Sequence, residues 1–308
     1  TPEDFTPFLQ VIKQRSDVVM NITTGASPYM PVEYRVKPAE TLQPEVASLN
    51  MGSMNFGLFP MLKRFKEFKH AWEPEMLEAS HDLVFRNSFK DISYALDTLN
   101  KTGTRYEFEC YDTAHLHNLY YFWQEGLVEG PLFIQTCFGL LGGIGSHPDE
   151  VMHMKRTADR LFGDNYRWSV LAAGAAQMKV AAMAASMGGH VRVGLEDSLW
   201  LGKGELAQTN AAQVTRVRQI IEGLGLSVAT ADEARDILSL KGGDKVAFRV
   251  GDQGVLPGSA VERQPGNQPD ESRRPRHDER RLPAVPGGEA DDQDRPPSEA
   301  IGESSPKG

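Results

Sequence analysis

The chain has 308 residues, of which 40% are hydrophobic, and a formal net charge of −9 at pH 7. This acidic balance argues against nucleic acid or an anionic membrane surface as the main partner. The two cysteines, Cys110 and Cys137, each lie inside an apolar run, which indicates two reduced core thiols in a cytoplasmic protein rather than a disulfide framework. No apolar run approaches the ~18–20 residues that cross a bilayer, and no signal peptide opens the chain.

Strand-like and helix-like segments alternate from the N-terminus to about residue 248. Six runs rich in aliphatic and β-branched residues predict strands, at 18–23, 46–51, 105–111, 132–138, 168–173 and 190–197. Helical periodicity falls between them, including one long predicted helix from about 75 to 99. This alternation predicts an α/β fold with a parallel sheet and right-handed crossovers.

The number of strands fits a TIM (β/α)₈ barrel of which only a part is present. A closed barrel of this kind needs eight strands and usually about 250 residues, whereas six strands are predicted here. The chain opens on Thr1 without a methionine, so we expect the two remaining strands to lie upstream.

The composition changes after Phe248. No Phe, Trp or Tyr follows it, and nine of the nineteen prolines lie beyond it among glycine and charged residues. Such a segment cannot bury enough apolar surface to offset its chain entropy. We therefore predict a catalytic domain over 1–248 and a disordered tail over 249–308.

The segment 58–72 combines aromatic side chains with four basic residues, Lys63, Arg64, Lys66 and Lys69. Basic and aromatic residues together can indicate nucleic-acid binding. In an acidic chain, a packed loop or a site for an anionic cofactor is the better interpretation.

The glycine-rich run 139–145 precedes a helix that is predicted to begin at Pro148. The run lacks the Gly-Lys-Ser/Thr ending of a Walker loop, and it fits the dinucleotide-binding fingerprint poorly. Its backbone N–H groups could still approach a phosphate or a thioester. An ordinary flexible loop explains the run equally well.

The stretch 190–197 carries the strongest signal for a site. Its aliphatic residues alternate with Arg192, Gly194 and Glu196, and it ends on Asp197, so a strand here would have one apolar and one charged face. Charges that face a barrel interior need partners, because an unpaired buried charge is very costly. Barrel enzymes keep their chemistry at the C-terminal ends of the strands. The alternative is an internal ion pair that only holds strands together.

A second strand shows the same division. Glu107 and Glu109 alternate with Tyr106, Phe108 and Cys110, so both carboxylates are predicted to point inward. Two strands that aim charges at one interior favour a functional site, although a satisfied internal network is the alternative.

Glu196 could ligate a metal, but the chain offers few histidines to accompany it. Catalytic zinc usually has three protein ligands, often histidines, and one open position. The only His-X-His is His115-Leu116-His117, and the residues that follow it look helical. On a helix the two rings would point about 200° apart, so this pair is disfavoured as a metal site. His115 alone could border the pocket.

Several blocks, taken together, resemble the β-keto acid cleavage enzymes, the family typified by 3-keto-5-aminohexanoate cleavage enzyme. The blocks follow the family's order, cover roughly residues 1 to 248, and lie at 21–25, 47–57, 107–113 and 191–197. The resemblance implies a zinc-dependent TIM barrel that is usually a homo-oligomer. It also implies a reaction in which a β-keto acid and acetyl-CoA give acetoacetate and a new acyl-CoA.

By motif position, the resemblance implies that Asp197 is the base, Arg192 its partner and substrate contact, and Glu109 a second acidic residue of the site. Glu196 matches the carboxylate zinc ligand. The residues implied to bind substrate are Thr24, Ser48, Asn50, Ser53 and Glu107.

One departure from the family pattern is serious. The family's two histidine ligands are expected in a His-X-His upstream of Thr1, and this chain begins after that point. We therefore expect this polypeptide by itself to be inactive, unstable or both. The alternatives are a different metal-dependent TIM-barrel lyase or aldolase and a non-catalytic barrel remnant. Dependence of turnover on acetyl-CoA separates the two enzyme classes.

Overall fold

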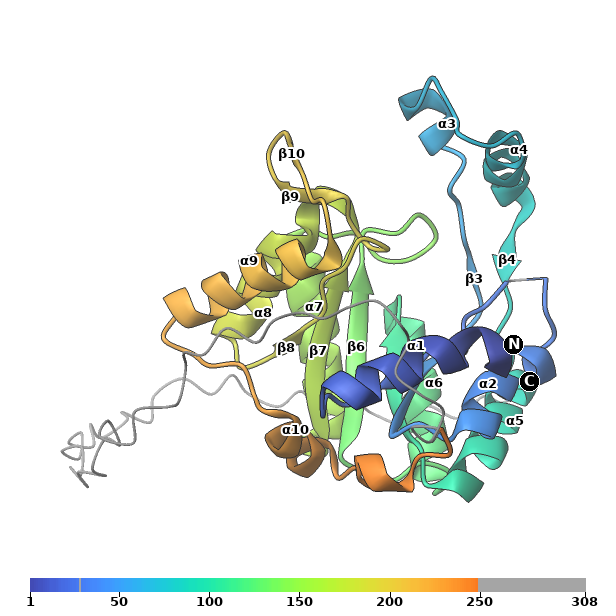
Figure 1. Cartoon of the computed structure of the whole chain (residues 1–308), viewed down its shortest axis with the longest axis vertical. Helices are drawn as coiled ribbons and strands as arrows, with labels where there is room; N and C mark the ends of the chain where they lie inside the picture. Colours follow the sequence, from blue (N-terminus) through green and yellow to red (C-terminus); the bar gives the residue numbers. More distant parts are fainter. Residues whose placement is uncertain (28, 249–308) are drawn as a thin grey trace, which may run out of the picture. The chain divides into compact units, whose positions relative to one another are not determined.

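A computed structural model describes residues 1–27 and 29–248, so the tail predicted over 249–308 lies outside the described residues. The centre of the fold is a curled parallel sheet with the strand order β1-β2-β5-β6-β7-β8 (Figure 1). The predicted α/β fold with six parallel strands is confirmed, and the sheet is what a partial TIM barrel would contain. Its strands are β1 (Asn21–Ile22), β2 (Val46–Asn50), β5 (Arg105–Cys110), β6 (Leu132–Phe138), β7 (Tyr166–Ala172) and β8 (His190–Val191).

Helices pack on the apolar face of this sheet and connect its strands. Neighbouring helices also pack in pairs, α2 with α5, α6 with α7 and α8 with α9. Among the described residues, no helix is long and apolar enough to span a membrane. The helices are α1 (Pro2–Arg15), α2 (Val32–Leu42), α5 (Phe89–Leu99), α6 (Thr113–Gln124), α7 (Pro148–Phe162), α8 (Gln177–Ser186), α9 (Asn210–Gly223) and α10 (Ala231–Leu238). Short 3₁₀ turns lie at Ser80–Asp82, Asn100–Thr102, Gly174–Ala176 and Gly243–Lys245.

The two faces of the sheet divide as the strand periodicity predicts. In β5, Tyr106, Phe108 and Cys110 are buried in the hydrophobic core, while Glu107 and Glu109 point to the opposite side, where they line a cavity. Alternation works here because successive side chains of a strand point to opposite faces. The two cysteines are free and buried, as expected.

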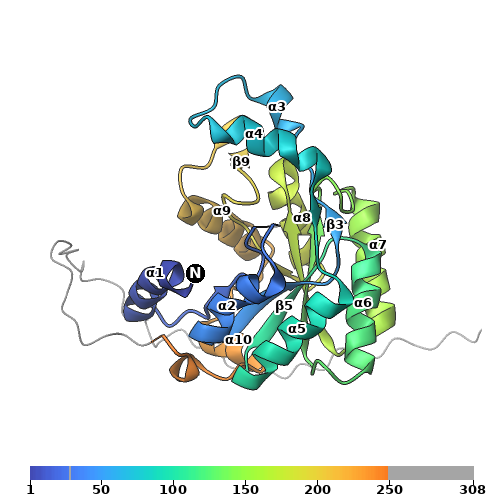
Figure 2. The same ribbon diagram turned by 90° about the vertical axis from the view of Figure 1, so that its right-hand side faces the viewer.

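An arm projects from the C-terminal side of the sheet (Figures 1 and 2). Its stem is an antiparallel ribbon of β3 (Met54–Asn55) and β4 (Val84–Phe85), which carries α3 (Met61–Arg64) and α4 (Trp72–Ala79). The single helix predicted over 75–99 is therefore wrong. The chain leaves α4 to form β4, and a capping box between Ser88 and Asp91 then starts α5, because these side chains satisfy the first backbone groups of a new helix.

The strand predicted over 190–197 is also wrong in its length. Strand β8 ends at Val191, and the last ladder bond runs from the N–H of Arg192 to the carbonyl of Val170. The chain then turns, and the N–H groups of Asp197 and Ser198 donate to the carbonyl of Gly194. Among the described residues β8 pairs only with β7, so no second neighbour holds these residues in an extended form. The turn matters because it places Glu196 and Asp197 next to each other beside Arg192. A second turn-rich segment follows, with the short hairpin of β9 (Trp200–Gly202) and β10 (Glu205–Leu206).

Candidate active site

A cavity of about 930 Å³ opens at the C-terminal ends of the strands. Parallel-barrel enzymes place their active sites at this end, where the loops that follow the strands converge. The lining residues come from the loop after β1, from β2, β5 and β7, from the arm, and from the turn after β8. The lining includes Ser48, Leu58, Met61, Glu107, Glu109, Tyr111, Arg192, Glu196 and Asp197.

Arg192 is the hub of the site. Its Nε donates to Asp197 Oδ2 at 3.1 Å, and its Nη2 donates to Asp197 Oδ1 at 3.2 Å. Nη1 donates to Glu109 Oε1 at 3.2 Å and to the Gln135 side-chain oxygen at 3.3 Å. Nη2 also donates to Glu196 Oε2 at 2.7 Å. Every N–H donor of the guanidinium is thus engaged, so a substrate group can bind Arg192 only by replacing one of these acceptors.

The acceptors of Arg192 differ in how firmly they are held. The side chain of Asp197 is 8% exposed and that of Glu109 is 14% exposed, whereas that of Glu196 is 83% exposed. An exposed ion pair contributes little because water competes with it. Glu196 is therefore the acceptor most easily displaced, and Asp197 and Glu109 are fixed parts of the site.

Buried negative charge perturbs the titration of the site. Burial, together with the charge of Glu107, raises the pKa of Glu109 to about 7. Burial also raises the pKa of Glu107 and that of Asp197, although Arg192 opposes both shifts. Burial works against the charged form of Arg192, but Asp197 and Glu109 outweigh it and raise the pKa of Arg192. The site therefore holds a permanent cation and at least one carboxyl group that titrates near neutral pH.

Three site residues escaped the sequence analysis. Gln135 is fully buried in β6, and its amide nitrogen donates to Glu107 Oε1 at 2.7 Å. Asn21 donates to the other oxygen of Glu107 at 2.9 Å, and the Tyr111 hydroxyl donates to Glu109 Oε2 at 3.1 Å. A lone glutamine within the apolar run of β6 was the signal that could have pointed to Gln135, because buried amides need partners.

The residues implied to bind substrate fall into two groups. Ser48 and Glu107 line the cavity. Thr24 is buried, and its hydroxyl donates to the carbonyl of Ser48 at 2.7 Å. Asn50 is also buried, next to Glu109 in the sheet register, and Ser53 accepts a hydrogen bond from the N–H of Asn87. Their roles toward a substrate stay predictions.

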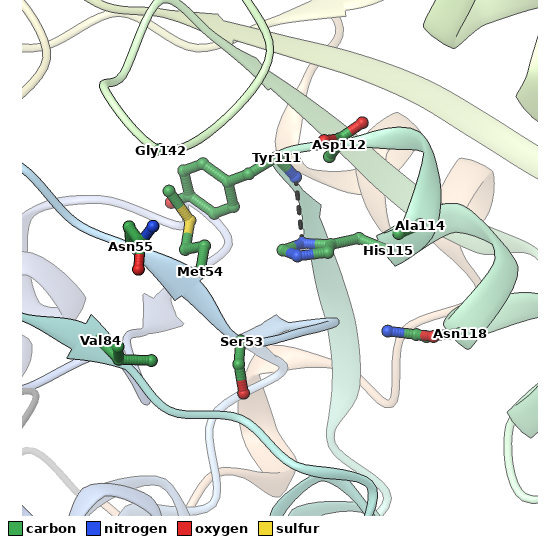
Figure 3. A pocket seen from close by; sticks show the side chains of 10 residues that line it. All are labelled: Ser53, Met54, Asn55, Val84, Tyr111, Asp112, Ala114, His115, Asn118 and Gly142. Carbon is green, nitrogen blue, oxygen red and sulfur yellow. Dashed lines mark hydrogen bonds between the residues drawn. The ribbon is translucent and has the colours of Figure 1, made fainter.

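A second cavity, of about 410 Å³, lies between the stem of the arm and the start of α6 (Figure 3). Ser53 and His115 both line it. His115 Nδ1 accepts a hydrogen bond from the N–H of Tyr111 at 3.2 Å, and burial lowers the pKa of His115. Because His115 and His117 lie on helix α6, two positions apart, they do not share a face. His115 thus fixes the end of β5 as a neutral ring.

The described side chains do not by themselves fit a catalytic zinc ion. Over residues 1–27 and 29–248, no three His, Cys, Asp or Glu side chains gather closely enough to hold a metal. Catalytic zinc takes three protein ligands, and the carboxylate of Glu196 is bound to Arg192. The role of Glu196 as a zinc ligand stays a prediction.

The fold and the site together define a class: a parallel α/β protein with a curled half-barrel sheet and an acid–arginine site at the C-terminal ends of its strands. Solved structures share this fold. The chain superposes on the apo structure of ObcA with a TM-score of 0.62 at 18% identity, over 78% of this chain and 55% of that chain. The binary complex of ObcA with oxaloacetate gives a TM-score of 0.59, also at 18% identity, over 78% of this chain and 56% of that chain.

The sequence comparisons go further than the fold. Residues 1–240 match the family model of beta-keto acid cleavage enzymes, and the chain belongs to this family. The 3,5-dioxohexanoate:acetyl-CoA acetone transferase of Paraburkholderia graminis is 57% identical over 247 residues, 80% of each chain. The 3-keto-5-aminohexanoate cleavage enzyme of Fusobacterium nucleatum is 30% identical over 240 residues, 78% of this chain and 77% of that protein. The expected family is confirmed, and with it membership of an enzyme family that breaks carbon–carbon bonds.

Proposed function

We propose that this protein exchanges acyl groups between a β-keto acid and acetyl-CoA, giving acetoacetate and a new acyl-CoA. The observation that carries the proposal is the bidentate pair of Asp197 and Arg192, buried beside Glu109 on the wall of a cavity. A carboxylate held this way is an oriented base. The chain belongs to the beta-keto acid cleavage enzyme family and is 57% identical to a 3,5-dioxohexanoate:acetyl-CoA acetone transferase. This similarity supports a β-keto acid and acetyl-CoA as the substrates on which the base acts.

The first half of the proposed reaction makes a carbon–carbon bond. Asp197 takes a proton from the carbon between the two carbonyl groups of the β-keto acid, and that carbon attacks the thioester carbonyl of acetyl-CoA. The CoA thiolate leaves. Burial raises the pKa of Asp197, which makes it a stronger base, while Arg192 keeps it ionised and fixes its orientation.

The second half breaks a different carbon–carbon bond. The CoA thiolate attacks the original keto carbonyl, and the bond between this carbonyl and the neighbouring carbon breaks. The new acyl-CoA forms, and the released carbanion takes back the proton from Asp197 to become acetoacetate. Arg192 stands where negative charge develops, and such preorganised cations stabilise transition states.

Substrate contacts form a further part of the proposal. Ser48 and Glu107 line the cavity, and we assign them to the substrate. Asn50 supports the same role, because both polar atoms of its side chain are buried without a hydrogen-bond partner among the described residues. An unsatisfied buried amide is costly, and a substrate oxygen or hydroxyl group could relieve that cost. Thr24 and Ser53 are assigned to positioning the loops around the cavity, through their bonds to Ser48 and Asn87.

Zinc enters the proposal only through Glu196. When bound, such an ion would act as a Lewis acid on the keto acid. Glu196 is the most exposed carboxylate paired with Arg192, but the described residues contain no group of three His, Cys, Asp or Glu side chains that could hold an ion. The steps above are therefore assigned to the side chains of this chain alone.

Isotope labelling tests the function directly. The protein is incubated with a β-keto acid and acetyl-CoA that carries ¹³C in its acetyl group, and the products are analysed by mass spectrometry. We expect the label in the methyl and keto carbons of acetoacetate and none in the new acyl-CoA. Turnover that proceeds without acetyl-CoA, or that yields unlabelled acetoacetate, would contradict the proposal and favour a lyase or aldolase.

A further inference from the structure

The segment 61–71, which forms one side of the outer arm, carries a cluster of cations. Residues 61–71 contain Lys63, Arg64, Lys66 and Lys69 but only one acidic residue, Glu67, in a chain whose net charge is −9. All four cations are exposed. Within residues 1–27 and 29–248, none of them forms an ion pair, although Arg64 lies over the ring of Phe65. The segment 61–71 therefore has a local excess of positive charge, although α4 beside it carries Glu73, Glu75 and Glu78. Such an excess in an acidic chain favours an anionic partner.

The cluster is connected to the active-site cavity. Leu58 and Met61, which immediately precede the first lysine, line that cavity together with Arg192 and Asp197. The N–H of Leu58 donates to Ser80 Oγ at 2.8 Å, and the ring of Phe59 stacks on His81 at 3.5 Å between centroids. These contacts tie the two sides of the arm together, and Met61 places the start of the segment 61–71 at the wall of the cavity. Figures 1 and 2 show α3 and α4 beyond the C-terminal ends of the strands.

The glycine-rich run 139–145 is the other candidate for binding an anion at this mouth, but three of its seven backbone N–H groups already bond to other backbone groups. The N–H of Gly139 donates to the carbonyl of Ile144, that of Gly143 to Leu140, and that of Ile144 to Tyr111. The loop also packs tightly, since a Cβ on Gly142 would lie 1.8 Å from the carbonyl oxygen of Asn55. Backbone groups that bond to each other cannot hold a phosphate. The charge on the arm is thus the better anion site.

We propose that Lys63, Lys66 and Lys69, with Arg64, bind the phosphate groups of acetyl-CoA. This inference rests on the proposed function, which requires the thioester of acetyl-CoA to reach Asp197. The remainder of this long molecule must then leave through the mouth of the cavity, past the apolar side chains of Leu58 and Met61, and its far end carries the phosphates. Lysine ammonium groups bind phosphates as point charges and need no fixed geometry, which suits side chains on an exposed arm.

A triple variant tests the inference. In K63Q/K66Q/K69Q, the dissociation constant of CoA, measured by calorimetry, should rise by about tenfold, because each exposed charge pair contributes modestly. The KM for acetyl-CoA should rise in parallel. Acetyl-pantetheine, which carries the thioester without the phosphates, should show an unchanged KM. The matched control K101Q/K179Q/K245Q removes three exposed lysines outside the arm and should change none of these values.

Salt gives a second readout. Raising the potassium chloride concentration should weaken CoA binding to the wild type more than binding to the triple variant, because salt screens exposed charges. Unchanged CoA binding in the triple variant, or an equal loss for acetyl-pantetheine, overturns the inference. Loss of self-association in the triple variant with unaltered CoA binding overturns it in favour of contact with a second copy of the chain. If CoA binding depends on the lysines while labelled acetoacetate never forms, the inference stands and the proposed reaction fails.

Discussion

Two arginine-centred clusters lie at opposite ends of the sheet, and each joins one arginine to three carboxylates. At the C-terminal ends of the strands, Arg192 pairs with Glu109, Glu196 and Asp197. At the N-terminal ends, Arg235 from α10 pairs with Asp17, Glu45 and Asp232. Glu45 directly precedes β2, and Asp17 lies a few residues before β1. This second cluster therefore joins α10, near the end of the described chain, to the N-terminal ends of the strands.

The two clusters differ in their balance of buried charge. Around Arg235, only Glu45 is deeply buried, with 1% of its side chain exposed, so one buried carboxylate faces one arginine. Around Arg192, both Asp197 and Glu109 are largely buried, and buried Glu107 lies close enough to raise the pKa of Glu109. A balanced pair joins parts of the fold, whereas an excess of buried negative charge shifts pKa values toward the range in which proton transfer is useful. The excess of buried negative charge and the open cavity, rather than the arginine itself, thus distinguish the active site from the Arg235 cluster, which only joins parts of the fold.

The largest effect should come from removing the base. We expect Asp197→Asn to lower kcat/KM by about 10³-fold, because general-base contributions are of this order, while the protein stays folded. Steady-state kinetics with acetyl-CoA and a β-keto acid, together with circular dichroism, measure the two properties. Asp232→Asn is the matched control at the other cluster, since Asp232 also pairs with an arginine, and it should leave turnover unchanged. Wild-type rates in Asp197→Asn would remove this residue from the mechanism.

Breaking the Arg235 cluster should lower the free energy of unfolding and leave the rate of catalysis unchanged. We expect Arg235→Met to lower the free energy of unfolding by about 3 kcal/mol, because it leaves the buried carboxylate of Glu45 without a partner. Urea denaturation measures this change. Arg192→Met should lose less stability, since the carboxyl groups around it already have raised pKa values and can take up protons. An equal loss of unfolding free energy in both variants would contradict this difference between the Arg235 cluster and the active site.

The hydroxyl of Tyr111 should set the pH profile. It donates to Glu109 and so favours the ionised form, which holds Arg192 in place. We expect the kcat/KM of the wild type to rise with an inflection near pH 7, the pKa of Glu109. In Tyr111→Phe the inflection should move upward by about one pH unit, because a hydrogen bond to a charged group is lost. Tyr121→Phe, an exposed position on α6, serves as the control. A Tyr111→Phe profile identical to the wild type would show that Glu109 does not control the rate.

The raised pKa of Glu109 should also make the stability of the fold depend on pH. The pKa of Glu109 is raised from an ordinary value of 4.5 to about 7 on folding, so between these values the folded state binds more protons than the unfolded state. Stability then falls as the pH rises from 4.5 to 7. Glu109→Gln removes this contribution, and we expect its unfolding free energy to decline less over that interval than the wild-type value does. Parallel curves from urea titrations at several pH values would contradict the shift.

The smallest expected signal concerns metal. Among the described residues Glu196 belongs to no group of three His, Cys, Asp or Glu side chains that could hold a metal, so we expect the purified chain to contain well under one zinc ion per molecule when measured by plasma mass spectrometry. Glu196→Gln should then change the zinc content little. Stoichiometric zinc that is lost in Glu196→Gln would instead establish this carboxylate as a ligand.

Local sequence patterns predicted much of the fold and part of the site. The alternation of Glu107 and Glu109 with apolar neighbours placed both carboxylates on the inner face of β5, and the structure puts them there. The prediction for β5 succeeds because the orientation of a side chain on a strand depends only on its position along that strand. Arg192 was assigned to the cavity from a strand predicted over 190–197, but β8 ends at Val191, so its position depends on the end of that strand and the turn after it.

Other features depend on contacts between residues far apart in the sequence, which local sequence patterns do not predict. Gln135 on β6 bridges Glu107 on β5 and Arg192 after β8, and Arg235 contacts Glu45 across 190 positions of the sequence. The long helix predicted over 75–99 failed for a related reason, because pairing of β3 with β4 overrides the helical periodicity. The early end of β8 also follows from which strands lie beside it.

The sequence by itself determined the alternating strands and helices, the inward carboxylates of β5 and the family to which the chain belongs, because these properties are written in spacing and in short blocks of residues. Tertiary structure decided which charges share one arginine and which carboxyl groups have raised pKa values. It also decided that the basic segment 61–71 begins at the wall of the cavity. The physical reason is that burial and electrostatic coupling act between groups close in space, and the fold brings such groups together from distant parts of the chain.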